Sequence, residues 1–218
     1  MLNLFPKING KVRISADGLA LSRGGVELFR DITVSLSRED ILWIHGGNGI
    51  GKTTLLEGLC GLLRPDLGRI EWAKDGAPCE ASDIIAYQPH LSFAKAVMSA
   101  GEELSFWAKL RGAEGLADLA LDYVGLASKA HVPCDKLSAG QKRRLALAKL
   151  IVSQKPIWIM DEPTAAIDKM GRDKIDALIG AHIARGGSAI IASHSLARAL
   201  GPKVRKLTLE AANLEAAP

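Results

Sequence analysis

Long hydrophobic runs are missing from this 218-residue sequence. No stretch approaches the roughly 18 unbroken apolar residues that a membrane-spanning helix needs, so we expect that the chain does not cross a bilayer by itself. The first eleven residues contain an apolar patch that is broken by Pro6 and Gly10. They lack the basic start, long apolar middle and small-residue cleavage site of a signal peptide, and we expect none.

Cysteine and excess charge are also scarce. The three cysteines, Cys60, Cys79 and Cys134, are far apart and form no Cys-x-x-Cys pair. This pattern predicts free thiols in a reducing cytoplasm rather than a disulfide scaffold or a zinc site. Lys and Arg exceed Asp and Glu by 28 to 24, a net charge of +4 with one basic run at 142–144. An excess this small does not require a nucleic-acid partner, and we expect none.

Short apolar runs predict the buried strands of the fold. They are bounded by turn residues and lie at 41–44, 157–160 and 189–192. Residues 12–45 are β-rich as a whole, and 70–72 predicts one more short strand. The composition, with 48% hydrophobic and 24% charged residues, is typical of a globular protein.

Helical periodicity separates these strands. Apolar residues recur at helical spacing over 52–63, 141–153 and 174–184. Short buried strands that alternate with helices predict an α/β fold with a largely parallel sheet. Residues 92–130 are rich in Ala and Leu and also predict helices. Because the longer stretch 92–150 holds helices without strands, we expect it to be an inserted helical subdomain.

A glycine-rich loop follows the predicted strand at 41–44 and opens the predicted helix at 52–63. It matches G-x-x-x-x-G-K-[ST] with Gly46, Gly47, Asn48, Gly49, Ile50, Gly51, Lys52 and Thr53. Glycines permit positive φ angles, so backbone N–H groups can converge on phosphate oxygens, and the helix start adds its positive dipole end. We expect Lys52 to reach the β- and γ-phosphates of a nucleotide and the Thr53 hydroxyl to ligate Mg²⁺.

Two adjacent carboxylates, Asp161 and Glu162, follow the predicted strand at 157–160. A carboxylate at the carboxyl end of a buried strand can face the phosphate loop across the top of the sheet. Asp161 is then placed to hold Mg²⁺, and Glu162 to accept a proton from the attacking water. Alone, this pair also fits a solvated acidic turn. Beside a phosphate loop we favour the catalytic interpretation, because a Mg²⁺–nucleotide site needs an acidic partner.

The segment 137–141, Leu-Ser-Ala-Gly-Gln, precedes the helix predicted at 141–153. Ser138 followed by Gln141 fits a capping box, which is an ordinary helix start. A helix start with a free hydroxyl and a glycine, here Gly140, can also hold a phosphate. The segment is far along the chain from the phosphate loop. We therefore expect it to touch the γ-phosphate that is bound by another copy of the chain.

Four motifs in this order resemble those of the ABC transporter ATPases: Walker A, signature, Walker B and switch histidine. They are Gly46–Thr54, Leu137–Gln141, Met160–Pro163 and His194, and the resemblance covers roughly residues 17–209. It implies a P-loop NTPase fold with a mostly parallel core sheet, a β-rich N-terminal subdomain and an inserted helical subdomain. It also implies Mg²⁺-dependent ATP hydrolysis in a head-to-tail dimer, with each ATP between one copy's phosphate loop and the other copy's signature segment.

The resemblance assigns roles to single residues. It implies that the Walker A residues, through Thr54, and the signature residues bind ATP. It also implies that Glu162 is the catalytic base. Asp168 resembles the D-loop aspartate, and His194 the histidine that contacts the γ-phosphate and orients the water. For the whole chain it implies an extension at 1–16, one ATPase domain at 17–210 with its helical subdomain at about 92–150, and a tail at 211–218.

Two positions depart from the usual pattern of the family. Arg23 stands where most members carry an aromatic residue that stacks on adenine, and an arginine plane can also stack on a base, although it also fits a surface charge. His90 stands where most members carry the glutamine of the loop before the helical subdomain. Gln88 lies two residues earlier and is the alternative equivalent. We favour His90 from the local alignment.

Both departures resemble the pattern of the haem-exporter subfamily of cytochrome c biogenesis, the CcmA type. Residues Leu137–Ala148 of this sequence also match the signature run of that subfamily closely. This resemblance implies membrane-spanning partner subunits of the CcmB type and a place on the cytoplasmic face of the cell membrane. By analogy with the family, the segment 92–136 and the loop 88–93 should receive a cytoplasmic helix of that partner. The aromatic residues there, taken singly, fit a subdomain core better; they are Phe93, Phe106, Trp107 and Tyr123.

Three alternatives stay open at this point. The first is the ATPase of another small ABC exporter or of a lipoprotein-release system. The second is a P-loop phosphotransferase, which would need a basic lid, whereas 92–130 holds few basic residues and the signature would lack a purpose. The third is a nucleotide switch without hydrolysis, and the presence of both Glu162 and His194 argues against it.

Overall fold

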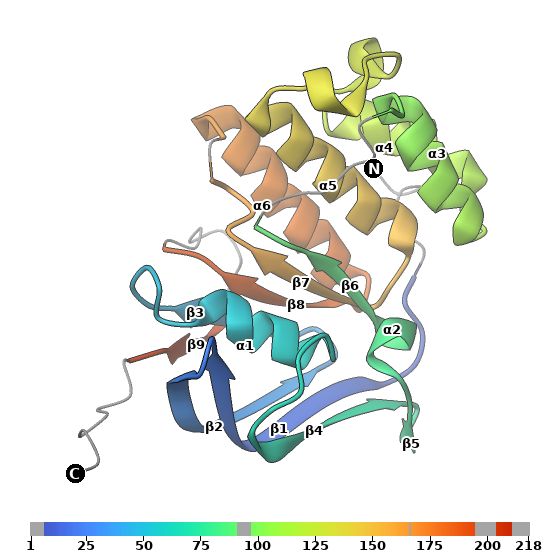
Figure 1. The fold of residues 1–218 in the computed structure, drawn as a ribbon. Helices are drawn as coiled ribbons and strands as arrows, with labels where there is room; N and C mark the ends of the chain where they lie inside the picture. Colours follow the sequence, from blue (N-terminus) through green and yellow to red (C-terminus); the bar gives the residue numbers. More distant parts are fainter. Residues whose placement is uncertain (1–6, 91–96, 166, 195–203, 211–218) are drawn as a thin grey trace.

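Two sheets and a group of helices make up the protein in the computed structural model, which describes residues 7–90, 97–165, 167–194 and 204–210 (Figure 1). The strands are β1 (Val12–Arg23), β2 (Val26–Ser37), β3 (Ile41–His45), β4 (Leu67–Lys74), β5 (Ala77–Pro78), β6 (Ile85–Gln88), β7 (Ile157–Asp161), β8 (Ser188–Ala192) and β9 (Val204–Thr208). The helices are α1 (Lys52–Leu59), α2 (Ala81–Ile84), α3 (Ala100–Leu110), α4 (Ala117–Tyr123), α5 (Ala139–Ser153) and α6 (Lys169–Ala184). Single 3-10 turns lie at Glu114–Leu116, Ala127–Lys129 and Cys134–Lys136.

The central sheet is parallel, with the strand order β6-β7-β8-β3-β9. Its three inner strands, β7, β8 and β3, are the three apolar runs of the sequence, so the predicted α/β fold with a parallel core sheet is confirmed. Strands that run the same way end at the same edge. The segments that follow β3, β6, β7 and β8 therefore all leave the sheet at its carboxyl edge, where ligands bind in open α/β sheets.

A second sheet is antiparallel and contains β2, β1, β4 and β5 in that order. Its long hairpin turns at Gly24 and Gly25, which have φ angles of 61° and 80°, as a tight two-residue β-turn requires. This sheet confirms the β-rich N-terminal part. Residues 12–16, which we placed in an extension before the domain, form the start of β1 and pair with both β2 and β4.

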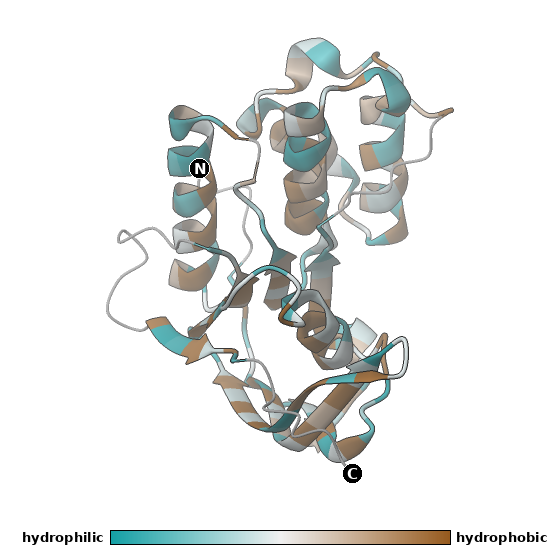
Figure 2. Ribbon diagram, turned by 60° about the vertical axis from the view of Figure 1, so that its left-hand side comes forward, coloured by the Kyte–Doolittle hydropathy of each residue, from teal (hydrophilic) through white to brown (hydrophobic). Residues whose placement is uncertain are grey.

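Apolar packing on the two faces of the parallel sheet holds these layers together. On one face, α1 and the inner side of the antiparallel sheet form one cluster with Ile44, Ile159 and Ile190. On the other face, α3, α4, α5 and α6 pack in a second cluster around Trp158, Met160 and Ile191. Figure 1 shows α1 between the two sheets and α5 and α6 beyond the parallel one. Hydrophobic colouring is concentrated in the strands and on parts of the helices (Figure 2).

The helix predicted over 52–63 ends earlier than its apolar pattern suggests. Gly61 has a φ of 72°, and its N–H and that of Leu62 donate back to the carbonyls of Gly58 and Glu57. This is a Schellman ending, which stops α1 at Leu59, so Leu62 is 67% exposed rather than buried in a helix. The prediction was wrong at this end because leucine spacing carries no information about a left-handed glycine.

The region between β6 and β7 is helical in its described part, and α3, α4 and α5 pack on one another. Phe93 and residues 92–96, where we expected this region to begin, lie outside the described residues, as does the tail 211–218. None of the described helices is both long and apolar enough to span a membrane. The limits of the domains stay predictions.

Acid is expected to destabilise this fold through one buried histidine. His182 of α6 is 2% exposed, and its ring stacks on Trp158 at 3.9 Å between centroids. Burial lowers the pKa of His182 from 6.5 to about 4. Above about pH 6.5 the ring is neutral in both states and the full stability is present. Below that value His182 is protonated in the unfolded chain but stays neutral in the folded chain, so stability is lost as the pH falls.

From about pH 7 to about pH 5, the free energy of unfolding should therefore drop by about 2 kcal/mol through this residue. Urea unfolding at the two pH values measures it. His182→Phe keeps an aromatic ring on Trp158 and removes the titrating group. If this variant loses as much stability as the parent over the same interval, His182 is not the cause.

Candidate functional site

An open cleft of about 740 Å³ lies at the carboxyl edge of the parallel sheet. It is lined by Arg23, Leu28, Gly47, Asn48, Gly49, Gly51, Lys52, Thr53, Thr54, Glu57, Tyr87, Pro89, His90, Asp161 and Glu162. The antiparallel sheet, the loop after β3, α1, and the ends of β6 and β7 all contribute to it. The cleft therefore gathers residues that the sequence analysis singled out in separate motifs.

The loop between β3 and α1 is shaped by glycines. Gly51 has a φ of 101°, and a Cβ there would also lie 3.0–3.1 Å from Phe29 and Leu28. At Gly47 and Gly49 a Cβ would meet nothing within 4 Å, so open space lies above the loop. No side chain caps the first turn of α1. The turn thus presents backbone N–H groups and the positive end of the helix dipole to an anion.

The loop is supported from below by the last described segment. Leu209 donates its N–H to the carbonyl of His45 at 2.8 Å, continuing the pairing of β9 with β3. A Cβ on Gly46 would lie 3.0 Å from the carbonyl oxygen of Leu209 and 2.9 Å from the side chain of Ile50. Gly46 and Ile50 are therefore structural parts of the loop and do not line the cleft.

Lys52 is 7% exposed, and its ammonium donates to the carbonyls of Gly46 and Gly47 at 2.9 Å each. Its charge is thus held directly under the loop on which phosphate would sit. Thr53 donates to Oδ2 of Asp161 at 2.6 Å. Asp161 is 2% exposed, as is Thr54 next along α1. The structure brings the two predicted metal ligands, from segments 108 residues apart, into direct contact.

This arrangement fits Mg²⁺ and a phosphate chain. A hydroxyl and a carboxylate oxygen are the hard oxygen donors that Mg²⁺ prefers, and they lie at the start of the helix that would hold the phosphates. Among the described residues there is no group of three or more His, Cys, Asp or Glu side chains that could hold a metal ion alone. A Mg²⁺ ion here would therefore be bound partly by Thr53 and Asp161 and partly by phosphate oxygens of the nucleotide, as is usual for Mg²⁺ in such sites.

Glu162 and His194 meet across the ends of β7 and β8. The Glu162 N–H donates to the carbonyl of Ala192 at 2.8 Å, with a φ of 48° at Glu162. The side chain is 16% exposed, and its Oε1 lies 3.7 Å from Nε2 of His194. This oxygen is buried and makes no hydrogen bond to any described residue. Nε2 of His194 donates to Oδ1 of Asn48 in the phosphate loop at 2.7 Å.

Arg23, His90 and Gln88 are placed differently around the cleft. Arg23 lines it and pairs with Glu57 of α1 at 2.8 Å, with 60% of its side chain exposed. His90 also lines the cleft and is exposed. Gln88 is 1% exposed, donates to the carbonyl of Pro89, and lines another cavity instead. His90 therefore lines the cleft and Gln88 does not, while the contact of His90 with a nucleotide stays a prediction.

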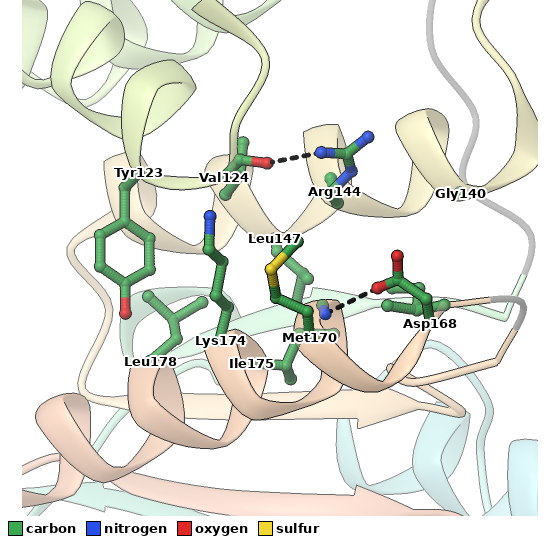
Figure 3. Close-up of a pocket in the computed structure, with 12 residues that line it drawn as sticks. Tyr123, Val124, Gly140, Arg144, Leu147, Asp168, Met170, Lys174, Ile175 and Leu178 are labelled. Carbon is green, nitrogen blue, oxygen red and sulfur yellow. Dashed lines mark hydrogen bonds between the residues drawn. The ribbon is translucent and has the colours of Figure 1, made fainter.

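The signature residues lie elsewhere on the surface. Ser138 caps α5, accepting from the N–H of Gln141 at 3.2 Å while the Gln141 side chain accepts from the Ser138 N–H at 2.9 Å. The predicted capping box is thus present. Gly140 and Asp168 line a smaller cavity of about 180 Å³ between α4, α5 and α6 (Figure 3). Asp168 caps α6, which therefore begins at Lys169 rather than at 174, by accepting from the N–H of Gly171 at 2.7 Å.

Two residues near the cleft had no role predicted for them from the sequence. Arg143 of α5 donates to the backbone carbonyl of Asp161 at 3.2 Å, and burial lowers the pKa of its guanidinium. It ties the signature helix to the strand end that holds the acidic pair. Tyr87 lines the cleft, and burial, with help from Asp161, raises the pKa of its phenol. Arg143 belongs to the basic run at 142–144 and to the signature run 137–148, but neither pattern predicts its contact with Asp161. No sequence pattern points to Tyr87.

Known proteins share this fold and sequence. The family model described as "ABC transporter" matches residues 29–165, more than half of the chain. The cytochrome c biogenesis ATP-binding export protein CcmA of Agrobacterium fabrum is 39% identical over 83% of this chain and 88% of its own. The protein of the same name from Rhizobium meliloti is 38% identical over 90% of this chain and 98% of its own. A solved ABC transporter ATP-binding protein from Pyrococcus furiosus superposes with a TM-score of 0.76, at 25% identity, over 90% of this chain and 97% of its own. The chain belongs to the ABC transporter family, as one of its ATP-binding subunits.

Proposed function

We propose that the chain is the Mg²⁺-dependent, ATP-hydrolysing subunit of a haem exporter of cytochrome c biogenesis. The observation that carries the hydrolytic part is the contact between Thr53 and Asp161 directly beside Lys52 and the phosphate loop. The relatives named CcmA, at 38–41% identity over most of the chain, support the cytochrome c part. Neither a phosphotransferase nor a non-hydrolysing switch has comparable support.

The residues of the cleft divide the reaction between them. Lys52 and the N–H groups of the loop and of α1 bind the β- and γ-phosphates, while Thr53 and Asp161 hold Mg²⁺. Bound Mg²⁺ neutralises charge on the phosphate oxygens. The carboxylate of Glu162 accepts the proton of the attacking water, and His194, held by Asn48, orients that water and the γ-phosphate. Arg23 and His90 contact the adenine side and the phosphate side of the nucleotide, respectively.

A second copy of the chain completes the site. Ser138, Gly140, Gln141 and Asp168 do not line the cleft of their own chain, and they lie at the starts of α5 and α6. Helix starts are suited to bind an anion from another copy. In a head-to-tail dimer, the first three residues of one copy reach the γ-phosphate that is bound by the other, and Asp168 lies at the contact between copies.

The transport step itself requires a partner. We propose a CcmB-type membrane-spanning subunit that binds the helical segment 92–136 and the loop 88–93, and a place for the chain on the cytoplasmic face of the cell membrane. The working unit contains residues 17–210, with 92–150 as its helical subdomain, and the strand β1 extends it back to Val12. The exposed Phe106 and half-buried Trp107 of α3 and Tyr123 of α4 lie in this segment.

Lys52→Ala should weaken ATP binding by about 30-fold, which corresponds to about 2 kcal/mol for a lost charge-assisted hydrogen bond. A calorimetric titration with Mg²⁺-ATP measures the affinity. Lys129→Ala removes a lysine from an exposed 3-10 turn outside the cleft and is the matched control. Thermal unfolding checks that the buried position tolerates alanine. Unchanged affinity in a folded Lys52→Ala variant would remove the phosphate-loop assignment and the proposed function with it.

A further inference from the structure

The peptide unit between Asp161 and Glu162 joins the last residue of β7 to the proposed catalytic base. Glu162 has a φ of 48°, in the left-handed region that is costly for residues other than glycine. Its side chain is 16% exposed. A strained turn of this kind keeps one conformation only when the surrounding structure holds it. The contacts of this peptide unit therefore decide where the Glu162 carboxylate lies.

Two neighbouring elements hold the peptide unit, one at each end. The N–H of Glu162 donates to the carbonyl of Ala192 on β8 at 2.8 Å. The carbonyl of Asp161 accepts from Nη1 of Arg143 on α5 at 3.2 Å. Because a trans peptide is planar, its N–H and C=O point in opposite directions, and fixing both of them sets the plane. Together with φ, that plane sets the direction in which the Glu162 side chain leaves the backbone.

Arg143 donates at the point where the pairing of β7 with β6 has ended. Since the N–H of Glu162 points to β8, the carbonyl of Asp161 points to the side of β6. The two strands pair only as far as Gln88 and Met160, one residue before Asp161. Asp161 is 2% exposed, so a backbone carbonyl without a donor would be costly there. The guanidinium of Arg143 thus takes the place of the next residue of β6.

Arg143 also brings a positive charge close to both carboxylates without pairing with either of them. Burial lowers the pKa of its guanidinium, and the negative charges of Asp161 and Glu162 oppose that shift. None of the ion pairs between described residues includes Arg143. A direct ion pair would occupy carboxylate oxygens that Mg²⁺ and the attacking water need, whereas a bond to the backbone does not.

We infer that Arg143 is a positioning residue for ATP hydrolysis. Through the carbonyl of Asp161 it fixes the turn that sets the direction of the Glu162 carboxylate. The inference rests on the proposed function, which makes Glu162 the base. It adds a residue that acts on turnover although it does not line the nucleotide cleft.

Arg143→Met keeps the aliphatic stem and removes both the donor and the charge. Turnover of Mg²⁺-ATP by the full chain should fall about 10- to 100-fold, because misplacing a catalytic group by about 1 Å can cost about 10²-fold. ATP affinity in a calorimetric titration should stay within about twofold, since Lys52 and the loop bind the phosphates. Arg144→Met is the matched control. Arg144 is the next residue of α5 and holds the carbonyls of Val124 and Gly125 at 3.2 Å each, so this variant should hydrolyse ATP like the parent.

The same substitution in a Glu162→Gln chain tests whether Arg143 acts through Glu162. Once the base is gone, losing Arg143 should lower the rate no further, so the double variant should match Glu162→Gln within about twofold. Single-turnover measurements with radiolabelled ATP resolve these slow rates. A defect of folding or of ATP binding would instead slow both backgrounds by the same factor, and thermal unfolding of each variant checks the fold.

An Arg143→Met chain that turns over like the parent would overturn the inference and leave the proposed function standing. So would a double variant that is slower than Glu162→Gln by the full factor seen in the parent background. If Glu162→Gln itself hydrolyses ATP like the parent, the base assignment of the proposed function fails, and the inference fails with it.

Discussion

Glu162→Gln should lower the rate of ATP hydrolysis by a factor of about 10² to 10⁴, the usual contribution of a general base. The variant keeps the size of the side chain and the backbone hydrogen bond to Ala192. It changes only the ability of the Oε1 position, which no described residue hydrogen-bonds, to take a proton. ATP affinity should stay within about twofold, because phosphate binding depends on Lys52 and the loop rather than on a base. Phosphate release and an ATP titration measure the two quantities.

The same variant should accumulate a dimer with ATP. Without hydrolysis, nucleotide stays bound between the two copies, so size-exclusion chromatography with ATP should show twice the mass of the nucleotide-free chain. Glu71→Gln on the exposed surface of β4 is the control and should behave like the parent. Normal turnover by Glu162→Gln would reject Glu162 as the base, and the absence of a dimer would weaken the two-copy arrangement.

Ser138→Arg should abolish turnover and leave the binding of ATP by a single copy intact. Ser138 does not line the cleft of its own chain, so a large cation there leaves the phosphate loop untouched. At the contact with a second copy it would block the γ-phosphate sterically. The substitution also removes the cap of α5, which costs about 1 kcal/mol of stability. Ser138→Ala removes the same cap without bulk and separates the two effects.

Mixing variants tests directly whether the site is shared. Lys52→Ala damages one half of a two-copy site and Ser138→Arg the other half. In a mixed dimer, one site holds both defects, while the other combines an intact Lys52 with an intact Ser138. At an ATP concentration too low to fill the weakened site of Lys52→Ala, the mixture should therefore hydrolyse ATP although neither variant does so alone. A Ser138→Arg variant that hydrolyses like the parent, or a mixture without rescue, would place the signature residues outside the reaction.

The core of the fold was predictable because its strands are buried on both faces. Such strands read as unbroken apolar runs, and β3, β7 and β8 were recognised in this way. The edge strands were not. Exposed Arg205 and Lys206 interrupt β9, and it is a strand only because it pairs with β3, more than 150 residues earlier. A short sequence pattern does not predict the pairing of two strands that are so far apart in the chain.

The candidate site divides along the same line. Residues whose role follows from a local turn or a strand end, such as Lys52 and Asp161, were found from the sequence, and the structure brings Asp161 to Thr53. Contacts between distant segments were not found. The bond from His194 to Asn48 and the reach of Arg143 to Asp161 join segments that only the folded sheet brings together. Contacts between two copies of the chain cannot be observed in the structure of one chain.

The support of the phosphate loop by Leu209 has a consequence for synthesis on the ribosome. The strands that flank β3 are β8 and β9, so the loop after β3 gains both neighbours only when about 160 further residues have been made. A nascent chain that stops short of residue 209 carries the whole glycine-rich motif but lacks the backbone on which Gly46 rests. We therefore expect the loop to bind ATP fully only after residue 209 has been made. A product that stops before β9 would carry the complete phosphate-binding sequence, and we expect it to bind nucleotide poorly. It would also leave one edge of β3 unpaired, where quality control can recognise it.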